Sequence, residues 1–356
     1  MKVQYASDLH IEFYDNSVFL ARGPFKVAGN VLVLAGDTLP LKEFDTYKQH
    51  RFFDWCADNF LETLLIPGNH EYYQDDVANY PEAWEKKLRP NVTMCENRSV
   101  VVDDTEFILS TLWSHIPMAD WLKLKKGMSD FTLIKASGKP FTATTYNALN
   151  ERDLAFIQKA VSGSRAAHKV VVTHHVPSPL VVSPEFRGSS LESGFTVDLT
   201  EYIGTSGVDL WVYGHSHRSI DRLIGKTWVV SNQVGYVAYG EYGKNFSGDR
   251  FVDLDEEGFT PRDKGEIINL TNRYNEGLFL TQVSPDSPWY KLSDSSSYVR
   301  IIDAEGDRIE AFAPSGGPYI YVGYQFGSRT VQEIRHQDGD ILVKISQNGA
   351  LYEREM

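Results

Sequence analysis

The sequence predicts an α/β protein whose inner sheet is largely parallel, followed by a small β-rich module at the C-terminal end. Two observations in the first 255 residues support this fold class: short β-branched apolar runs recur, and longer stretches with helical spacing lie between them. A third observation concerns the rest of the chain, where apolar runs alternate with Gly- and Asp-containing turns, a pattern typical of antiparallel strands.

Five apolar runs in the first part end at polar residues, and we expect each to be a buried strand. They are VQYA (3–6), VLVLA (31–35), LLIP (64–67), VVVT (170–173) and LWVY (210–213). Polar-apolar stretches such as 47–62, 78–88 and 147–162 lie between them, and the last has apolar residues at helical spacing. Strands that alternate with helices build βαβ units, so the inner sheet should be parallel.

The chain divides by composition into three parts. We expect a first domain over residues 1–255, in which the irregular segment 110–146 is an insertion packed near a site. Residues 256–297 are expected to be a connecting segment, because VSPDSPWYKLSDSSS (283–297) is rich in Pro, Ser and Asp. Residues 298–356 contain YVRII, YIYVGY, TVQEI and ILVKI, and we expect them to form the β-rich module, whose role the sequence does not indicate.

Composition excludes several classes of protein. The 356 residues include 35 Lys and Arg against 48 Asp and Glu, a net charge of −13, which disfavours nucleic acid as a partner. Two cysteines are too few for a disulfide scaffold or a cysteine zinc module. Because no apolar run has the length of a membrane span and no secretory signal is evident, we expect a cytoplasmic protein with no membrane partner.

Polar side chains with metal-binding chemistry follow the five predicted strands at their C-terminal ends. They are Asp8, His10, Asp37, Asn69, His70, His174, His215 and His217. Ligands of α/β sheets bind at this edge. Residues two apart in extended backbone share a face, which would direct Asp8 with His10, and His215 with His217, toward the same side. Imidazole with carboxylate suits Mn, Fe, Zn or Ni better than Mg or Ca, and one bridging carboxylate would allow two ions.

Along the chain these residues form the patterns D-x-H, G-D, G-N-H-E, H and G-H-x-H, which together resemble the signature of the calcineurin-like metallophosphoesterases. The resemblance covers roughly residues 1–255, and TLW (111–113), VVVTHHVPS (170–178) and NQVGY (232–236) look like a bacterial and phage branch. It implies a four-layer α-β-β-α sandwich with two divalent metal ions at one edge. Residues 256–356 resemble nothing comparable.

The resemblance also implies a role for each motif residue. One ion would be held by Asp8, His10, Asp37 and His217. The other would be held by Asp37, Asn69, His174 and His215, so that Asp37 bridges. His70 would face the phosphate, stabilising its charge or protonating the leaving oxygen. Because His174 and His175 are adjacent in a strand and point to opposite faces, only one can be a ligand. The T-H pattern favours His174 and leaves His175 near the site, as a candidate for substrate contact.

Further residues are candidates for substrate contact. Arg218 follows the last ligand and Arg187 lies in the loop after His174, although either is equally explained as a solvated loop residue. Tyr72 and Tyr73 are candidates for stacking on a base or for packing the helix after His70.

The expected function is that of a dinuclear metal-dependent phosphodiesterase acting on a small phosphoester substrate, a diester or nucleotide, by in-line attack of an activated water. Manganese is the expected ion, with Fe, Zn or Ni as alternatives. A nuclease, for which LKLKKG (122–127) is a short basic candidate, and a phosphomonoesterase are alternatives within the same chemistry. A non-catalytic metal-binding scaffold is an alternative of another class, and the oligomeric state is left open.

Overall fold

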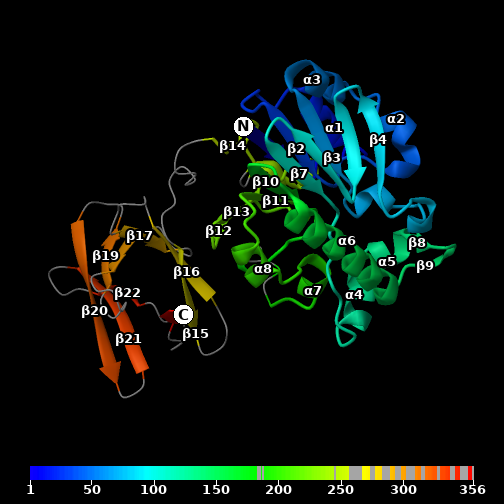
Figure 1. Ribbon diagram of the computed structural model, residues 1–356. Coiled ribbons are helices and arrows are strands. Elements are labelled where there is room, and N and C mark those ends of the chain that lie inside the picture. Colours follow the sequence, from blue (N-terminus) through cyan, green and yellow to red (C-terminus); the bar gives the residue numbers. More distant parts are fainter. Residues whose placement is uncertain are drawn as a thin grey trace. The chain divides into compact units, whose positions relative to one another are not determined.

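The computed structural model describes residues 1–182, 186, 188–243 and 246–255, and beyond them the backbone of nine strands between residues 267 and 354 (Figure 1). The chain divides into two compact units, the first over residues 1–257 and the second over residues 258–356.

The first unit contains two six-stranded sheets. In the first sheet the order is β14 (Phe251–Asp253), β1 (Lys2–Ala6), β2 (Val31–Ala35), β3 (Glu62–Ile66), β5 (Val92–Glu96) and β4 (Trp84–Arg89). The four inner strands are parallel, and the two edge strands are antiparallel to their neighbours. Strand β4 overlaps the end of the polar-apolar stretch 78–88 and was not predicted as a strand, because its alternating burial follows from pairing with β5 and not from an apolar run.

The second sheet repeats this plan. Its order is β12 (Arg222–Ile224), β13 (Thr227–Ser231), β11 (Leu210–Tyr213), β10 (His168–Val172), β7 (Thr105–Leu109) and β6 (Arg98–Val102). The four inner strands are again parallel, with antiparallel strands at both edges. All five predicted buried strands are therefore inner strands of the two sheets.

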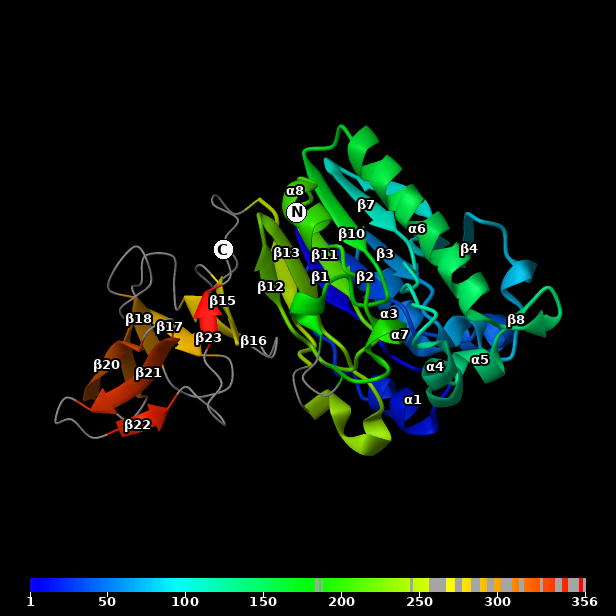
Figure 2. The same ribbon diagram turned by 90° about the horizontal axis from the view of Figure 1, so that it is seen from below.

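Helices cover the outer faces of the two sheets (Figures 1 and 2). On the first sheet lie α1 (Tyr14–Ala21), α2 (Phe44–Tyr47) and α3 (Arg51–Asn59). On the second lie α6 (Ala143–Gly163) and α8 (Thr200–Thr205). Both faces of β2 are buried, since Leu32 packs toward the helices and Val33 faces the other way, each 0% exposed. This arrangement confirms the expected α-β-β-α sandwich.

The segment 110–146 forms short elements that do not extend either sheet. They are α4 (Trp121–Gly127), α5 (Asp130–Leu133) and a hairpin of β8 (Lys135–Ala136) and β9 (Lys139–Pro140), and α7 (Glu192–Phe195) packs against the end of α4. Helix α6 begins four residues before the expected stretch, because the Thr142 side chain accepts a hydrogen bond from the Thr145 backbone and caps the helix there.

The second unit is a nine-stranded antiparallel sheet. In spatial order its strands are β22 (Ile341–Lys344), β21 (Arg329–His336), β20 (Gly317–Phe326), β19 (Ile309–Ala313), β18 (Tyr298–Ile301), β17 (Trp289–Leu292), β16 (Gly277–Gln282), β15 (Ile267–Asn272) and β23 (Tyr352–Arg354). Three of them lie inside the range 256–297 that was expected to be a linker, so that expectation is corrected: the Pro- and Ser-rich composition hid short runs of β-forming residues.

Among the described residues, no helix combines the length and the apolar character needed to cross a membrane.

Candidate metal centre

The candidate ligands come together where strands β1, β2, β3, β10 and β11 end. The structure differs from the sequence expectation in how they do so. Asp8, His10, Asp37, His215 and His217 all have left-handed backbone, with φ of 57°, 47°, 53°, 75° and 49°, where extended backbone was expected for the two D-x-H and H-x-H pairs. Left-handed backbone is unfavourable for residues other than glycine and persists where the surrounding structure imposes it, often at functional sites. Here it turns each loop sharply after its strand.

A first cluster contains the side chains of Asp8, His10, Asp37 and His217, whose ligand atoms all lie within 4.8 Å of one another. The Nε2 atoms of His10 and His217 are 3.1 Å apart. Nε2 of His217 lies 3.5 Å from Oδ1 of Asp8, and Nε2 of His10 lies 3.8 Å from Oδ2 of Asp37. Three different loops therefore direct donor atoms at one point.

A second cluster contains Asp37, His174 and His215. Nε2 of His174 lies 3.1 Å from Nδ1 of His215, 3.1 Å from Oδ1 of Asn69 and 3.4 Å from Oδ1 of Asp37. The two oxygens of Asp37 thus face different clusters, Oδ2 toward the first and Oδ1 toward the second, as a bridging carboxylate requires.

The hydrogen bonds around the clusters show that the donor set fits two cations. The outward Nδ1 atoms of three histidines face oxygen acceptors: His10 faces Glu12 at 3.2 Å, His174 faces the Ala35 carbonyl at 2.9 Å, and His217 faces Glu241 at 2.7 Å. A proton on each outward nitrogen leaves a lone pair on each inward Nε2. Lone pairs that converge at 3.1 Å repel one another unless a proton or a metal ion lies between them.

Electrostatics favour positive charge at this point. Burial opposes ionisation of Asp37, but the neighbouring His174 and His70 hold its pKa well below the usual range. Burial would lower the pKa of His174, yet the Asp37 charge and hydrogen bond raise it to about 9. In the absence of metal the carboxylates therefore attract a proton to His174, and a divalent cation would take the place of that proton.

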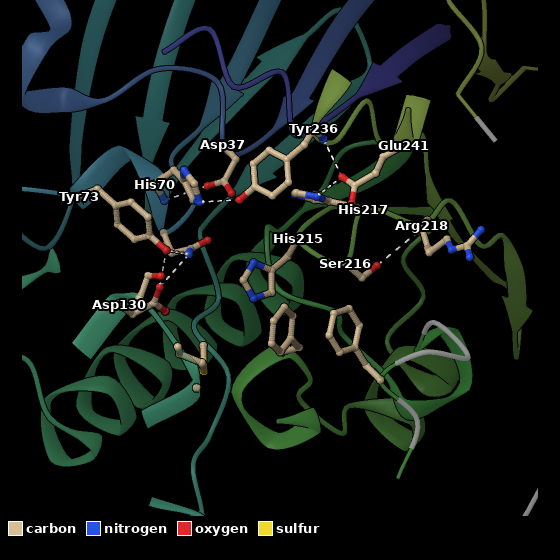
Figure 3. A pocket seen from close by; sticks show the side chains of 16 residues that line it. Asp37, His70, Tyr73, Asp130, His215, Ser216, His217, Arg218, Tyr236 and Glu241 are labelled. Atoms are coloured by element: carbon tan, nitrogen blue, oxygen red, sulfur yellow. Dashed lines mark hydrogen bonds and ion pairs between the residues drawn. The ribbon is translucent and has the colours of Figure 1, made fainter. Parts of the chain in front are cut away.

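His70 lies beside the clusters with its ring at the cavity wall (Figure 3). Its Nδ1 is 2.9 Å from Oε1 of Glu12, its Nε2 is 3.3 Å from the Tyr236 hydroxyl, and its ring stacks on Tyr73 with centroids 4.1 Å apart. Burial would lower the pKa of His70, but the Asp37 charge and the Glu12 hydrogen bond raise it to about 9. The imidazole is therefore protonated at neutral pH.

Sequence reasoning missed three carboxylates that support these side chains. Glu12 serves both His10 and His70, and Glu241 serves His217. Asp130, in the 110–146 segment, accepts hydrogen bonds from the Asn69 side-chain amide at 2.9 Å and the Tyr73 hydroxyl at 2.8 Å. Only Glu12 had a local signal, because it follows His10 by two residues; the other two are far from their partners in the sequence.

Glu71, the last residue of the G-N-H-E pattern, has a structural role. Its buried carboxylate accepts hydrogen bonds from four backbone N–H groups. The N···O distances are 3.0 Å for Asp37, 2.6 Å for Thr38, 3.1 Å for Leu39 and 2.7 Å for Gly68. One side chain thereby holds the loop after β2 against the loop after β3, which carry Asp37 and His70.

The adjacent histidines occupy different environments. His174 lies in the second cluster, whereas His175 is fully buried and its Nε2 is 2.9 Å from the Tyr146 hydroxyl. His175 does not line the cavity, so the expectation that it contacts substrate is corrected; the opposite faces of consecutive strand-end residues explain the separation. Tyr72 is buried against Tyr80 and Trp113 and is also away from the cavity.

A cavity of about 340 Å³ opens next to the clusters. Of the candidates for substrate contact, Arg218 and Tyr73 line it, whereas Arg187 lies outside the described residues. The other lining residues include Met128 and Asp130 from the 110–146 segment and two phenylalanines, Phe186 and Phe195. Figure 3 shows His70, Tyr73 and Asp130 on one side of this cavity and Ser216 and Arg218 on the other.

The chain is similar to a protein family, to a viral protein and to solved structures. Residues 1–219 match the family model of the calcineurin-like phosphoesterases. The uncharacterized protein L509 of Acanthamoeba polyphaga mimivirus is 26% identical over 279 residues, which are 71% of this chain and 97% of the viral protein. Phosphopantetheinyl hydrolase from Mycobacterium tuberculosis has a similar fold, with a TM-score of 0.55 and 19% identity, covering 72% of this chain and 97% of that one. A dimetal phosphatase from Danio rerio aligns over 65% of this chain and 87% of its own, with a TM-score of 0.34 and 13% identity.

Proposed function

This chain belongs to the calcineurin-like phosphoesterase family, and we propose that within it the protein acts as a manganese-dependent phosphodiesterase on small diesters. Membership makes it a metal-dependent hydrolase of phosphoric esters with a dinuclear site of divalent ions. The diester preference and the identity of the metal are the parts that we add.

The ligand assignment follows the two clusters. We assign the first ion to Asp8, His10, Asp37 and His217, and the second to Asp37, Asn69, His174 and His215. The converging lone pairs on the inward ring nitrogens and the divided orientation of the Asp37 oxygens support this assignment. When bound, the ions would supply positive charge for the phosphate oxygens and activate a water for in-line attack.

The observation that carries the proposal is the position of His70 at the cavity wall next to both clusters, with its Nδ1 2.9 Å from Oε1 of Glu12. Glu12 holds the proton on Nδ1, so Nε2–H is the group that His70 presents beside the Tyr236 hydroxyl. From there it would donate a proton to the leaving oxygen of a bound phosphoester, which then departs as an alcohol instead of an alkoxide.

The charges around the cavity favour a diester over a monoester. Beyond the clusters, the cavity is lined by the carboxyl groups of Asp130 and Glu241, and Arg218 is the lone Lys or Arg among its described lining residues. A diester brings one negative charge and a monoester at neutral pH brings nearly two. The carboxyl groups of Asp130 and Glu241 form an acidic wall that would repel the second charge of a monoester. The same wall and the net charge of −13 disfavour a nuclease acting on long polyanions.

The test compares hydrolysis of bis(p-nitrophenyl) phosphate with that of p-nitrophenyl phosphate by metal-stripped protein, with and without added Mn²⁺. We expect Mn²⁺-dependent cleavage with a higher kcat/KM for the diester. A higher kcat/KM for the monoester would contradict the diester preference and favour a phosphomonoesterase. Bound metal without turnover of either compound would contradict simple phosphoesterase action.

A further inference from the structure

One wall of the cavity is apolar and aromatic, and we call its side chains Met128, Phe186 and Phe195 the apolar shelf. The rings of Phe186 and Phe195 stack with centroids 4.5 Å apart and an angle of 18° between their planes. The Phe195 ring in turn lies 4.5 Å from the ring of His215, tilted by 31°. The Phe195 ring therefore lies next to both Phe186 and His215, which belongs to the second metal cluster.

Two close approaches between α4 and α7 hold the shelf in place. A Cβ at Gly194 would overlap the sulfur of Met128, and a Cβ at Gly127 would lie 2.6 Å from a methyl carbon of Leu191. Glycine at both positions lets the two short helices pack closely and presses the Met128 side chain between them. The shelf is thus built by the first unit itself, from the 110–146 segment and the α7 region.

The character of the shelf limits what can lie on it. Its three side chains carry no charge, and the charged side chains that line the same cavity are those of the metal clusters with His70, Asp130, Arg218 and Glu241. The organic part of a phosphoester is the only part of that substrate class that would gain free energy on this surface, because a second phosphate would lose its hydration there. Aromatic rings, which attract other rings in stacked or edge-to-face arrangements, with a polarizable sulfur beside them favour an aromatic group over a bulky aliphatic one.

We propose that the apolar shelf is the binding site for a planar aromatic group of the substrate, such as a nucleobase, while the phosphate lies on the metal clusters. This inference rests on the proposed function and names the class of diester that the site selects. It makes Phe195 and Phe186 specificity-determining residues, since they contact the organic group and not the reacting atoms.

Binding of three phosphonates to the Mn²⁺-loaded full chain, measured by isothermal titration calorimetry, tests the proposal without requiring turnover. Phenylphosphonate, cyclohexylphosphonate and methylphosphonate are each used as the O-methyl monoester, which carries one negative charge as a phosphodiester does, so that they differ only in the organic substituent. We expect phenylphosphonate to bind about three- to tenfold more tightly than cyclohexylphosphonate, and methylphosphonate to bind most weakly of the three. Equal affinities would overturn the shelf, and tighter binding of the cyclohexyl compound would replace the planar occupant with an aliphatic one.

Variants at and next to the apolar shelf test whether the preference for a phenyl substituent depends on its side chains. Phe195→Leu and Phe186→Leu are each expected to reduce the preference for phenyl over cyclohexyl to less than about twofold. Gly194→Ala should displace the Met128 side chain from its position in the shelf and weaken binding of phenylphosphonate more than that of methylphosphonate. Tyr14→Leu, at a position 81% exposed and outside the cavity lining, is the matched control and should change nothing. An unchanged preference in all three shelf variants would overturn the proposal.

Hydrolysis of bis(p-nitrophenyl) phosphate, measured on the same preparations, distinguishes failure of the proposed function from failure of the apolar shelf. The expected ranking of phosphonates without diester hydrolysis would contradict the proposed function and support the shelf as a binding site. Hydrolysis without any ranking would support the function and overturn the shelf.

Discussion

Oε1 of Glu12 lies 2.9 Å from Nδ1 of His70, and the same oxygen lies 3.2 Å from Nδ1 of His10. One carboxylate oxygen therefore orients both a proposed metal ligand and the proposed proton donor. Burial would raise the pKa of Glu12, but the two histidine hydrogen bonds lower it to about 2, so the carboxylate is charged over the whole range in which the enzyme would work.

The Glu12→Gln variant is expected to change the pH dependence of kcat. The negative charge of Glu12 contributes to the raised pKa of His70, about 9, so that the protonated, active form exists below that pKa and is lost as the pH rises through it. Removing the charge lowers the pKa of His70, and the alkaline limb of the kcat profile should move to lower pH. Glu151→Gln, at an exposed position, is the control. An alkaline limb that stays in place would contradict the role given to Glu12.

The His70→Asn variant is expected to lower kcat by about 10²–10⁴-fold while retaining both metal ions. The loss should be larger for diesters with poor leaving groups, since those depend most on protonation of the departing oxygen. The rate is measured over a series of aryl leaving groups, and metal content is measured by mass spectrometry. His115→Asn, at an exposed position, should behave as the wild type. Equal losses across the series would exclude His70 as the proton donor.

Asp37→Asn is expected to weaken metal binding at both clusters, because its two oxygens face different ones. His10→Ala and His174→Ala should each weaken only one, since each imidazole belongs to a single cluster. Metal bound per chain after gel filtration distinguishes these outcomes, with Asp103→Asn at an exposed position as the control. Two tightly held ions in Asp37→Asn would show that this carboxylate does not bridge.

His175→Ala is expected to destabilise the fold without loss of metal or change in KM. The substitution leaves a space beneath the site and removes the partner of the Tyr146 hydroxyl, for an expected loss of about 2–3 kcal/mol in the free energy of unfolding. Urea unfolding of the metal-free protein measures this loss, with His115→Ala for comparison. Loss of one ion in His175→Ala, with both retained in His174→Ala, would reverse the assignment of the two histidines.

Glu71→Gln is expected to lower the free energy of unfolding by about 2–3 kcal/mol. The amide N–H₂ of glutamine would face backbone N–H groups that now donate hydrogen bonds to the carboxylate, so those hydrogen bonds would be lost. Metal affinity should fall as well, since the loops of Asp37 and His70 are held together by this side chain. Urea unfolding and metal titration measure the two effects, and Glu82→Gln at an exposed position is the control. Unchanged stability would argue that the four hydrogen bonds contribute little.

The C-terminal part of the chain shows where composition misleads. The Pro, Ser and Asp residues of 283–297 indicated a linker, yet β17 lies within that range and pairs with β16 and β18. A four-residue strand needs only a few β-forming residues when neighbours on both sides supply its hydrogen bonds, so it leaves little trace in the composition of a longer window.

By itself, the sequence determined the α/β class, the five inner strands, and the residues that end them with metal-binding chemistry. These features are local: an apolar run stops where polar residues begin, and the ligand types are visible at the boundary. Only the tertiary structure decided that His174 and not His175 lies in the second cluster, and that Glu12, Asp130 and Glu241 support the site. Such pairings join loops far apart in the chain, through left-handed turns that the surrounding packing imposes, and no local pattern records which loops will meet.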